Sequence, residues 1–202
     1  IPGRSVVISD THTFTPAVVN EFKLGFNRTY ATNNDHNFGV DVQSQLGIQG
    51  IDNPSNDPAI SSMPQFSFTG SNIPIAVSTS RNQVYTAQNT YQLIDNLSWF
   101  TGRHNIKVGV DIRKLQVNSG NKPLTIRGTY GYDDRLTGLA YANFLLGWPS
   151  QATRGIARPS AYPRSTYSGF YIQDDFKLHP RVTLNYGVRY EYQTPWVEKF
   201  DR

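Results

Sequence analysis

The chain has 202 residues and a net charge of +4, and its 38% of hydrophobic residues includes a large aromatic share, with 12 Tyr and 11 Phe. It contains no cysteine, which excludes disulfide bonds and thiolate metal sites. No run approaches the roughly 18 apolar residues of a transmembrane helix, and the basic residues are spread rather than clustered. We therefore expect no membrane-spanning helix and no nucleic-acid partner.

Both ends of the sequence favour a piece cut from a longer protein. Residues 1–4 show neither an initiator Met nor the basic and apolar regions of a signal peptide. Residues 199–202 do not form an apolar strand with a terminal aromatic residue. We therefore expect this chain to be an internal segment of its protein.

Two strands are predicted near the N-terminus, over residues 5–14 and 19–30. The second places its aromatic and aliphatic side chains on one parity, and therefore on one face, because strand side chains alternate with period 2. Only a short turn with Pro16 separates the strands, so we expect an antiparallel hairpin. The next stretch, residues 31–80, is dominated by Asn, Asp, Gly, Pro and Ser, which predicts a long, weakly structured loop.

The middle of the chain predicts a second hairpin and then a break in the rhythm. Residues 83–100 alternate as one strand, residues 101–105 form a turn, and residues 106–113 return with Ile and Val on one parity. Residues 124–132 predict a short strand.

One short helix is predicted near residues 138–146, because residues 136–147 leave the period of 2 and end with Gly147. A weak strand over residues 150–158 and a loop over residues 158–165 follow.

The cleanest pattern lies over residues 167–193, which alternate on both sides of a turn at residues 178–181. Asp174 is the exception, since it falls on the apolar parity. The pattern predicts a long amphipathic hairpin with one aromatic face and one charged face. We expect Asp174 at the level of the lipid headgroups if the hairpin crosses a membrane, because a deeper carboxylate would be costly.

The elements together predict an all-β fold of about eight meandering antiparallel strands. Three architectures fit: a segment of a transmembrane β-barrel, a soluble β-sandwich that binds carbohydrate or mediates adhesion, and a complete eight-stranded barrel with a structural role. Long strands, aromatic residues near strand ends, and short turns that alternate with long loops favour the membrane barrel.

Short motifs spread over nearly the whole chain carry a family resemblance. They are Ser9–Pro16 with Val19–Phe22, Asp95–Trp99 with Gly102–His104 and Lys107–Asp111, Ala142–Gly147, and Tyr171–Lys177 with Leu184–Glu191. In these motifs the chain resembles the barrel of TonB-dependent outer-membrane receptors, in particular the Oar-like branch with carboxypeptidase-regulatory-like domains.

The resemblance implies a location in the bacterial outer membrane and energy-coupled uptake, or surface export, of an unidentified substrate. It implies that residues 1–202 belong to one barrel domain, with residues 31–80 as an outer loop and no plug domain in this chain. The implied partners are outer-membrane lipid and the plug domain and TonB complex of the full-length protein. We expect no enzymatic activity and no cofactor.

Parity assigns the charged residues of the strands to the barrel lumen. There they would either contact a plug or substrate or form lateral ion pairs that solvate the wall, and we favour the ion pairs. These lumen-facing candidates are Glu21, Lys23, Lys107, Asp111, Asp175, Arg189 and Glu191. The opposite parity predicts lipid-facing and girdle residues. These are Phe22, Phe26, Trp99, Val108, Phe170, Ile172, Tyr186, Val188, Tyr190 and Tyr192.

Metal and catalytic chemistry find little support in the sequence. The four histidines are isolated from one another, without the spacing of metal ligands. Asp133–Asp134 and Asp174–Asp175 are adjacent pairs, and neighbours in a strand point to opposite faces, so neither pair can act on one substrate. We therefore predict no catalytic and no metal-binding residue.

Overall fold

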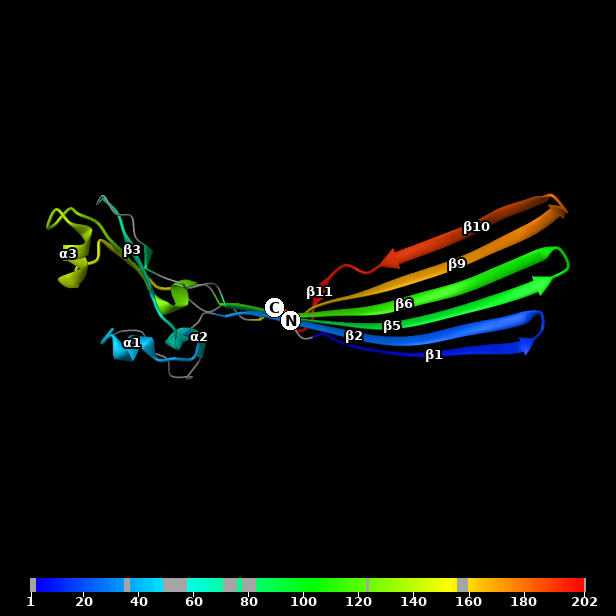
Figure 1. Cartoon of the computed structure of the whole chain (residues 1–202), viewed down its shortest axis with the longest axis horizontal. Helices are drawn as coiled ribbons and strands as arrows, with labels where there is room; N and C mark the ends of the chain where they lie inside the picture. Colours follow the sequence, from blue (N-terminus) through cyan, green and yellow to red (C-terminus); the bar gives the residue numbers. More distant parts are fainter. Residues whose placement is uncertain are drawn as a thin grey trace. The chain divides into compact units, whose positions relative to one another are not determined.

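The computed structural model divides the chain into two compact units (Figure 1). Unit 1 comprises residues 1–31, 86–118 and 161–202, and unit 2 comprises residues 32–85 and 119–160. None of the helices in the described residues is long and apolar enough to cross a membrane. The structure describes residues 3–34, 37–48, 58–70, 76–77, 83–122, 124–155 and 160–201.

Unit 1 is built on one sheet with the strand order β1-β2-β5-β6-β9-β10. Pairs β1–β2, β6–β9 and β9–β10 are antiparallel, and a short strand, β11 (Val197–Glu198), pairs with the start of β9. The six main strands are β1 (Gly3–Thr15), β2 (Val18–Asn33), β5 (Gln83–Thr101), β6 (His104–Lys122), β9 (Pro163–His179) and β10 (Val182–Gln193).

Three tight turns join these strands in pairs, as the sequence predicts: β1 to β2, β5 to β6, and β9 to β10. The turn between β5 and β6 has only two residues, and Gly102 adopts a φ of 57° there, a conformation that glycine enters without a steric penalty. Within the described residues, β1 and β10 are the two ends of the strand order and do not pair with each other. The closed eight-stranded barrel is therefore not what the structure shows.

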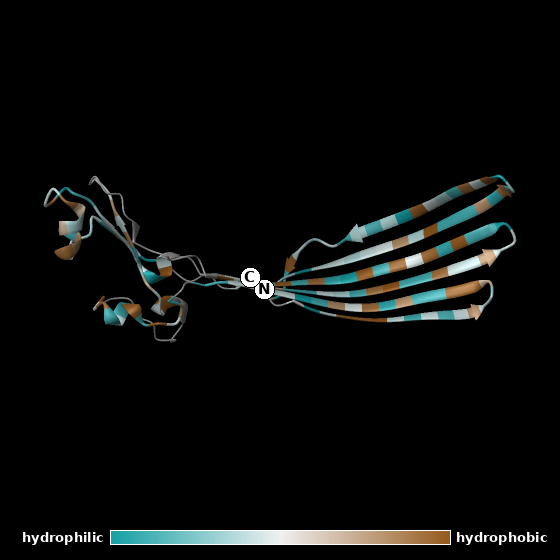
Figure 2. Cartoon of the chain, in the orientation of Figure 1, coloured by the Kyte–Doolittle hydropathy of each residue, from teal (hydrophilic) through white to brown (hydrophobic). Residues whose placement is uncertain are grey.

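The two faces of this sheet differ in polarity, because the register between the strands places apolar residues beside apolar residues on one face. Ile172 of β9 lies opposite Val188 of β10 and Val108 of β6, and Phe170 lies opposite Tyr190 and Val110. Figure 2 shows the resulting alternation of hydropathy along the strands. We call the face that carries these side chains the apolar face and the opposite one the polar face.

The apolar face is open rather than packed into a core. Val188 is 71% exposed, Tyr190 62% and Ile172 52%. In a soluble sandwich these side chains would be buried between two sheets. The sandwich alternative is therefore wrong.

Unit 2 is made of short elements around a second sheet, with the order β4-β3-β7-β8. Strands β3 and β7 pair in parallel, while β3–β4 and β7–β8 pair antiparallel. The elements are α1 (Val42–Gln45), α2 (Pro58–Ser61), β3 (Gln65–Phe68), β4 (Ala76–Val77), the 3-10 helix η1 (Leu124–Arg127), β7 (Thr129–Tyr132), α3 (Ala140–Leu145) and β8 (Gln151–Thr153).

An aromatic cluster forms the core of unit 2. Phe66 and Phe68 of β3 are 7% and 9% exposed, and Tyr132 of β7 is 6% exposed. Phe144 of α3 meets the rings of all three at centroid distances of 5.2–5.5 Å, edge to face. Ala140 of α3 is fully buried against the same cluster, which explains why a helix with exposed leucines docks there.

Two regions differ from the prediction. Residues 31–80 were expected as a weakly structured loop, but α1, α2 and β3 belong to a unit with its own core. Residues 124–132 were expected as a strand of the barrel series, but they form η1 and β7, and β7 joins the second sheet. Alternation alone cannot say to which sheet a short strand belongs, because it carries no information on the partner.

The loop predicted over residues 158–165 ends earlier than expected, because β9 begins at Pro163. Two other expectations for this part of the chain agree with the structure. The helix predicted near residues 138–146 is α3, and the weak strand predicted over residues 150–158 is present as β8. The end of that predicted strand, residues 156–159, lies outside the described residues.

Candidate functional site

The polar face of unit 1 carries all seven residues that parity assigns to the lumen. Asp111 of β6 and Glu191 of β10 both lie opposite Gly169 of β9, so they flank one position of the sheet. Lys107 lies opposite Gln173, which in turn lies opposite Gly187. The remaining four follow the same parity: Glu21, Lys23, Asp175 and Arg189.

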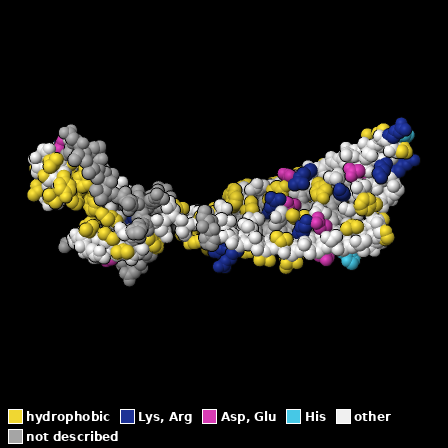
Figure 3. Space-filling view, in the orientation of Figure 1, with side chains coloured by type: hydrophobic (Ala, Val, Ile, Leu, Met, Phe, Trp, Pro, Cys, Tyr) yellow, Lys and Arg dark blue, Asp and Glu magenta, His cyan; other side chains and the backbone are white. Residues whose placement is uncertain are grey.

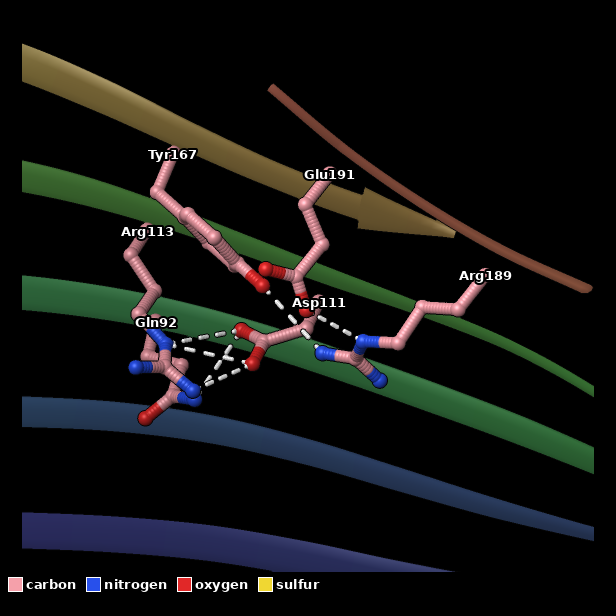
Figure 4. Close-up of polar contacts among 6 residues, drawn as sticks. All are labelled: Gln92, Asp111, Arg113, Tyr167, Arg189 and Glu191. Carbon is pink, nitrogen blue, oxygen red and sulfur yellow. Dashed lines mark hydrogen bonds and ion pairs between the residues drawn. The ribbon is translucent and has the colours of Figure 1, made fainter. Parts of the chain in front are cut away.

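A cluster around Asp111, shown in Figure 4, spans β5 and β6. Gln92 donates from Nε2 to Asp111 Oδ1 at 3.0 Å, and Arg113 donates from Nε to both carboxylate oxygens at 3.1 Å. Asp111 is largely shielded, with 16% of its side chain exposed, whereas Arg113 is 43% exposed. The arginine therefore neutralises the carboxylate and still presents its outer edge to the space above the face.

Tyr167 of β9 connects this cluster to β10. The Arg113 guanidinium lies 5.1 Å from the centre of the Tyr167 ring, a cation–π distance. On the other side, Arg189 donates from Nη2 to the Tyr167 hydroxyl oxygen at 3.2 Å and forms an ion pair with Glu191. Four strands are thus joined by alternating acidic, basic and aromatic groups (Figure 4).

A second cluster on the same face joins β2, β5 and β9. Lys23 Nζ lies 2.6 Å from Glu21 Oε1, and Asn96 donates from Nδ2 to Glu21 Oε2 at 3.3 Å. Asn96 also accepts a hydrogen bond of 2.8 Å from the Tyr171 hydroxyl. Gly109 makes this contact possible, because a Cβ there would stand 2.1 Å from the Tyr171 ring.

The sequence analysis did not single out five members of these clusters. They are Gln92, Asn96, Arg113, Tyr167 and Tyr171. All five fall on the polar parity of their strands, so parity could have found them, but charge was used as the filter. The neutral amide and phenol groups were therefore missed, although they make cross-strand hydrogen bonds, and Arg113 was missed although it is charged.

The charged side chains of these clusters pair with their neighbours. Within the described residues no three His, Asp or Glu side chains converge on a possible metal position. Acidic and basic side chains are interspersed (Figure 3), and most are already paired with a neighbour. This arrangement provides a hydrated wall with exposed hydrogen-bonding groups.

The ten predicted lipid-facing residues lie on the apolar face, by the same parity and cross-strand pairing. Phe26 of β2 contacts Tyr91 of β5 at a ring distance of 5.1 Å, which continues the aromatic surface toward β1. A shallow apolar hollow of about 600 Å³ runs over the centre of the sheet. Its lining includes Leu97, Val108, Ile172 and Val188.

Asp174, the exception to the alternation, lies on the apolar face with two polar partners. Its Oδ2 is 2.6 Å from His104 Nδ1 and accepts a hydrogen bond of 2.7 Å from the Tyr186 hydroxyl. His104 also stacks on Phe176 with a ring distance of 4.5 Å. The cluster lies near the β5–β6 turn, since His104 is the first residue of β6. A buried carboxylate needs such partners, because it has lost its contacts with water.

Of the remaining histidines, His12 lies on β1 beside Phe14 and His179 is the last residue of β9, while His36 is outside the described residues. In unit 2, burial raises the pKa of the Tyr132 hydroxyl above its ordinary value. A neutral phenol in an aromatic core is a packing group.

Comparison with known proteins agrees with this architecture. The family described as outer membrane beta barrel domain matches residues 1–202. The outer membrane transporter YddB from Escherichia coli has a similar structure, with a TM-score of 0.55 at 10% sequence identity. The match covers 95% of this chain but 21% of that transporter, so the chain spans about a fifth of its length. No curated protein matches the chain.

Proposed function

The chain belongs to the outer membrane beta barrel domain family and is located in the bacterial outer membrane, and on that premise we propose that unit 1 is a section of the wall of a transporter barrel. The apolar face contacts lipid, and the polar face lines the lumen. Six long strands with an open order supply part of a wall, since a strand edge in lipid must be paired to satisfy its backbone groups.

The observation that supports this proposal is the contrast between the two faces of one sheet. Large apolar side chains are exposed on one face, whereas the other joins its charges across three strands, β6, β9 and β10, through Arg113, Tyr167 and Arg189. A water-filled lumen solvates such charges, and lipid solvates the aromatic face. Neither water alone nor lipid alone would solvate both faces.

A fluorescence experiment tests this assignment, and residues 1–202 contribute no background label because they contain no cysteine. Single Cys variants of the full-length protein at Val188 and Arg189 are labelled with bimane and reconstituted in nanodiscs with brominated lipids. We expect strong quenching at position 188 and little at position 189, because adjacent strand residues point to opposite faces. Position pair Val108 and Lys107 is the matched control on β6. Equal quenching within each pair would overturn the proposal.

We further propose that the full-length protein is a TonB-dependent, Oar-like receptor whose plug contacts the polar face. The support is the sequence resemblance, together with the exposed guanidinium groups of Arg113 and Arg189. Their exposed donors suit carboxylate and carbonyl oxygens of a neighbouring domain or a passing substrate. The proposal gives this segment a role in transport, by uptake or export, and no enzymatic role.

Photo-cross-linking in cells tests the plug contact. A photoreactive phenylalanine replaces Arg189 in the full-length protein, and mass spectrometry maps the cross-linked peptide. We expect a cross-link to a segment of the same protein outside residues 1–202. The Val188 position serves as the control and should capture lipid. A second strain lacking TonB should lose transport while it keeps the cross-link, and transport that persists there would contradict energy coupling.

A further inference from the structure

Three basic residues stand at one end of the apolar face of unit 1. Arg4 of β1 and Arg28 of β2 lie directly opposite each other, on the parity of Val6 and Phe26. Lys114 of β6 shares the parity of Val108 and lies opposite Thr166 of β9. All three side chains are exposed. We call Arg4, Arg28 and Lys114 the basic belt.

The basic belt differs from the charges of the polar face in its partners. There, Lys23, Arg113 and Arg189 each pair with a carboxylate. In the part of the chain that the structure describes, no carboxylate pairs with Arg4, Arg28 or Lys114. Two like charges directly opposite on neighbouring strands repel each other, so the Arg4–Arg28 pair calls for an anion from outside the chain.

The height of the belt identifies the kind of anion. Arg4, Arg28 and Lys114 are each about ten or eleven residues from the tight turn of their own hairpin. At about 3.3 Å per residue and a strand tilt of about 40°, that distance rises roughly 25–28 Å, which is close to the roughly 25 Å height of the apolar band of an outer-membrane barrel. The belt therefore lies at the headgroup level of the leaflet opposite the tight turns.

The surface below the belt is suited to acyl chains. On β1, Val6 is 60% exposed and Ile8 is 63% exposed, and the Phe26–Tyr91 aromatic pair adjoins them. A ligand with phosphate above hydrocarbon chains fits both parts. Arginine is the residue best suited to phosphate, because its planar fork binds two oxygens at once.

We propose that Arg4 and Arg28, assisted by Lys114, bind the phosphate of a lipid headgroup in the outer leaflet. The site deepens the proposed function, on which it rests for the contact of the apolar face with lipid. The belt lies in the outer leaflet because the tight turns of outer-membrane barrels lie on the periplasmic side. The lipid would fix the height of β1 and β2 in the membrane and neutralise the Arg4–Arg28 repulsion.

Native mass spectrometry of the full-length protein tests the site with deep-rough lipopolysaccharide, which carries phosphates on its lipid anchor. We expect bound lipopolysaccharide on the unchanged protein and roughly 30-fold weaker binding for the R4Q/R28Q variant, as two lost cationic contacts imply. The R4K/R28K variant keeps the charge but loses the planar fork, so it should bind more tightly than R4Q/R28Q and less tightly than the unchanged protein. Dephosphorylated lipopolysaccharide should not bind tightly.

The matched control removes two charges at the other end of the hairpins, in the variant R103Q/R181Q, and should bind as the unchanged protein does. Folding of each variant is checked by heat-dependent mobility in detergent gels. Unchanged binding by R4Q/R28Q, or an equal loss in R103Q/R181Q, would overturn the proposal. Free phosphate that competes as well as the lipid would also overturn it. Bimane quenching at positions 188 and 189 in the same nanodiscs separates failure of this site from failure of the lumen assignment.

Discussion

Units 1 and 2 use the same kinds of side chain in opposite ways. In unit 2 the aromatic residues are inside: Phe66 and Tyr132 are 7% and 6% exposed. In unit 1 they are outside: Tyr190 is 62% exposed and Phe170 is 47% exposed. Both units satisfy their backbone groups through sheets, so the difference lies in what solvates the side chains.

With the apolar face of unit 1 in lipid, as proposed, two solvents act on one chain. Unit 2 folds as water requires, with an apolar centre, because burial of apolar surface away from water stabilises it. Unit 1 gains nothing from such a centre, because lipid is as apolar as its own side chains. Its specificity comes instead from backbone pairing and from polar clusters on the side away from lipid.

The largest effect should come from the core of unit 2. Phe66→Ala removes the ring that contacts Tyr130, Tyr132 and Phe144, and should destabilise unit 2 by about 3–5 kcal/mol. The matched change Phe170→Ala on the apolar face should cost about 1 kcal/mol, mainly from the lost cross-strand pair with Tyr190. Hydrogen exchange at residues 129–132 and 184–190 measures each effect. Equal losses in both units would remove the distinction between them.

A charge on the apolar face should have the next largest effect. Val188→Arg places a cation where we expect lipid, at a cost of about 2–4 kcal/mol near the bilayer midplane. Asn185→Arg, on the polar face of the same strand, should change stability by less than about 0.5 kcal/mol. Urea titration of the full-length protein in lipid vesicles compares the two. If Val188→Arg is as mild as Asn185→Arg, the face is not in contact with lipid.

A smaller effect is expected at the close approach on the polar face. Gly109→Ala would bring Cβ within 2.1 Å of the Tyr171 ring and 2.5 Å of Asn96 Oδ1, so the Tyr171–Asn96 hydrogen bond must break. We expect a loss of about 1–3 kcal/mol, measured by the same titration. Gly25→Ala is the control, because its Cβ would meet no atom closer than 3.9 Å. If Gly25→Ala is equally destabilising, the loss in Gly109→Ala comes from replacing a glycine in a strand and not from the contact with Tyr171.

The smallest effect concerns pH in unit 2. Asp41 caps α1 and accepts hydrogen bonds from the Ser44 amide and hydroxyl, which hold the pKa of its carboxyl below the ordinary 3.8. Because the pKa of Asp41 is lower in the folded state, the cap is fully stabilising at a pH above the pKa of the unfolded state. That stabilisation is lost as the pH falls through the folded pKa. We expect the Ser44 amide to lose protection below about pH 4 in hydrogen exchange. The same pH response in Asp41→Ala would assign it to another group.

The faces of unit 1 could be predicted from the sequence because each hairpin is local. Alternation in residues 182–192 assigns Val188 and Arg189 to opposite faces without any knowledge of the neighbours. The prediction failed where the partner is distant. Asn96 and Tyr171 are 75 residues apart, and β3 pairs in parallel with β7 across more than 50 residues. Register between such segments depends on side-chain packing that no local pattern contains.

The sequence by itself determined the amphipathic strands, their three tight turns and the helix at residues 140–145, since period and turn residues encode them locally. Only the tertiary structure decided that residues 65–68 and 129–132 leave the barrel series for a second sheet. It also decided which charges meet. Gln92 meets Asp111 across β5 and β6, and Arg113 meets Tyr167 across β6 and β9, because of the register between these strands.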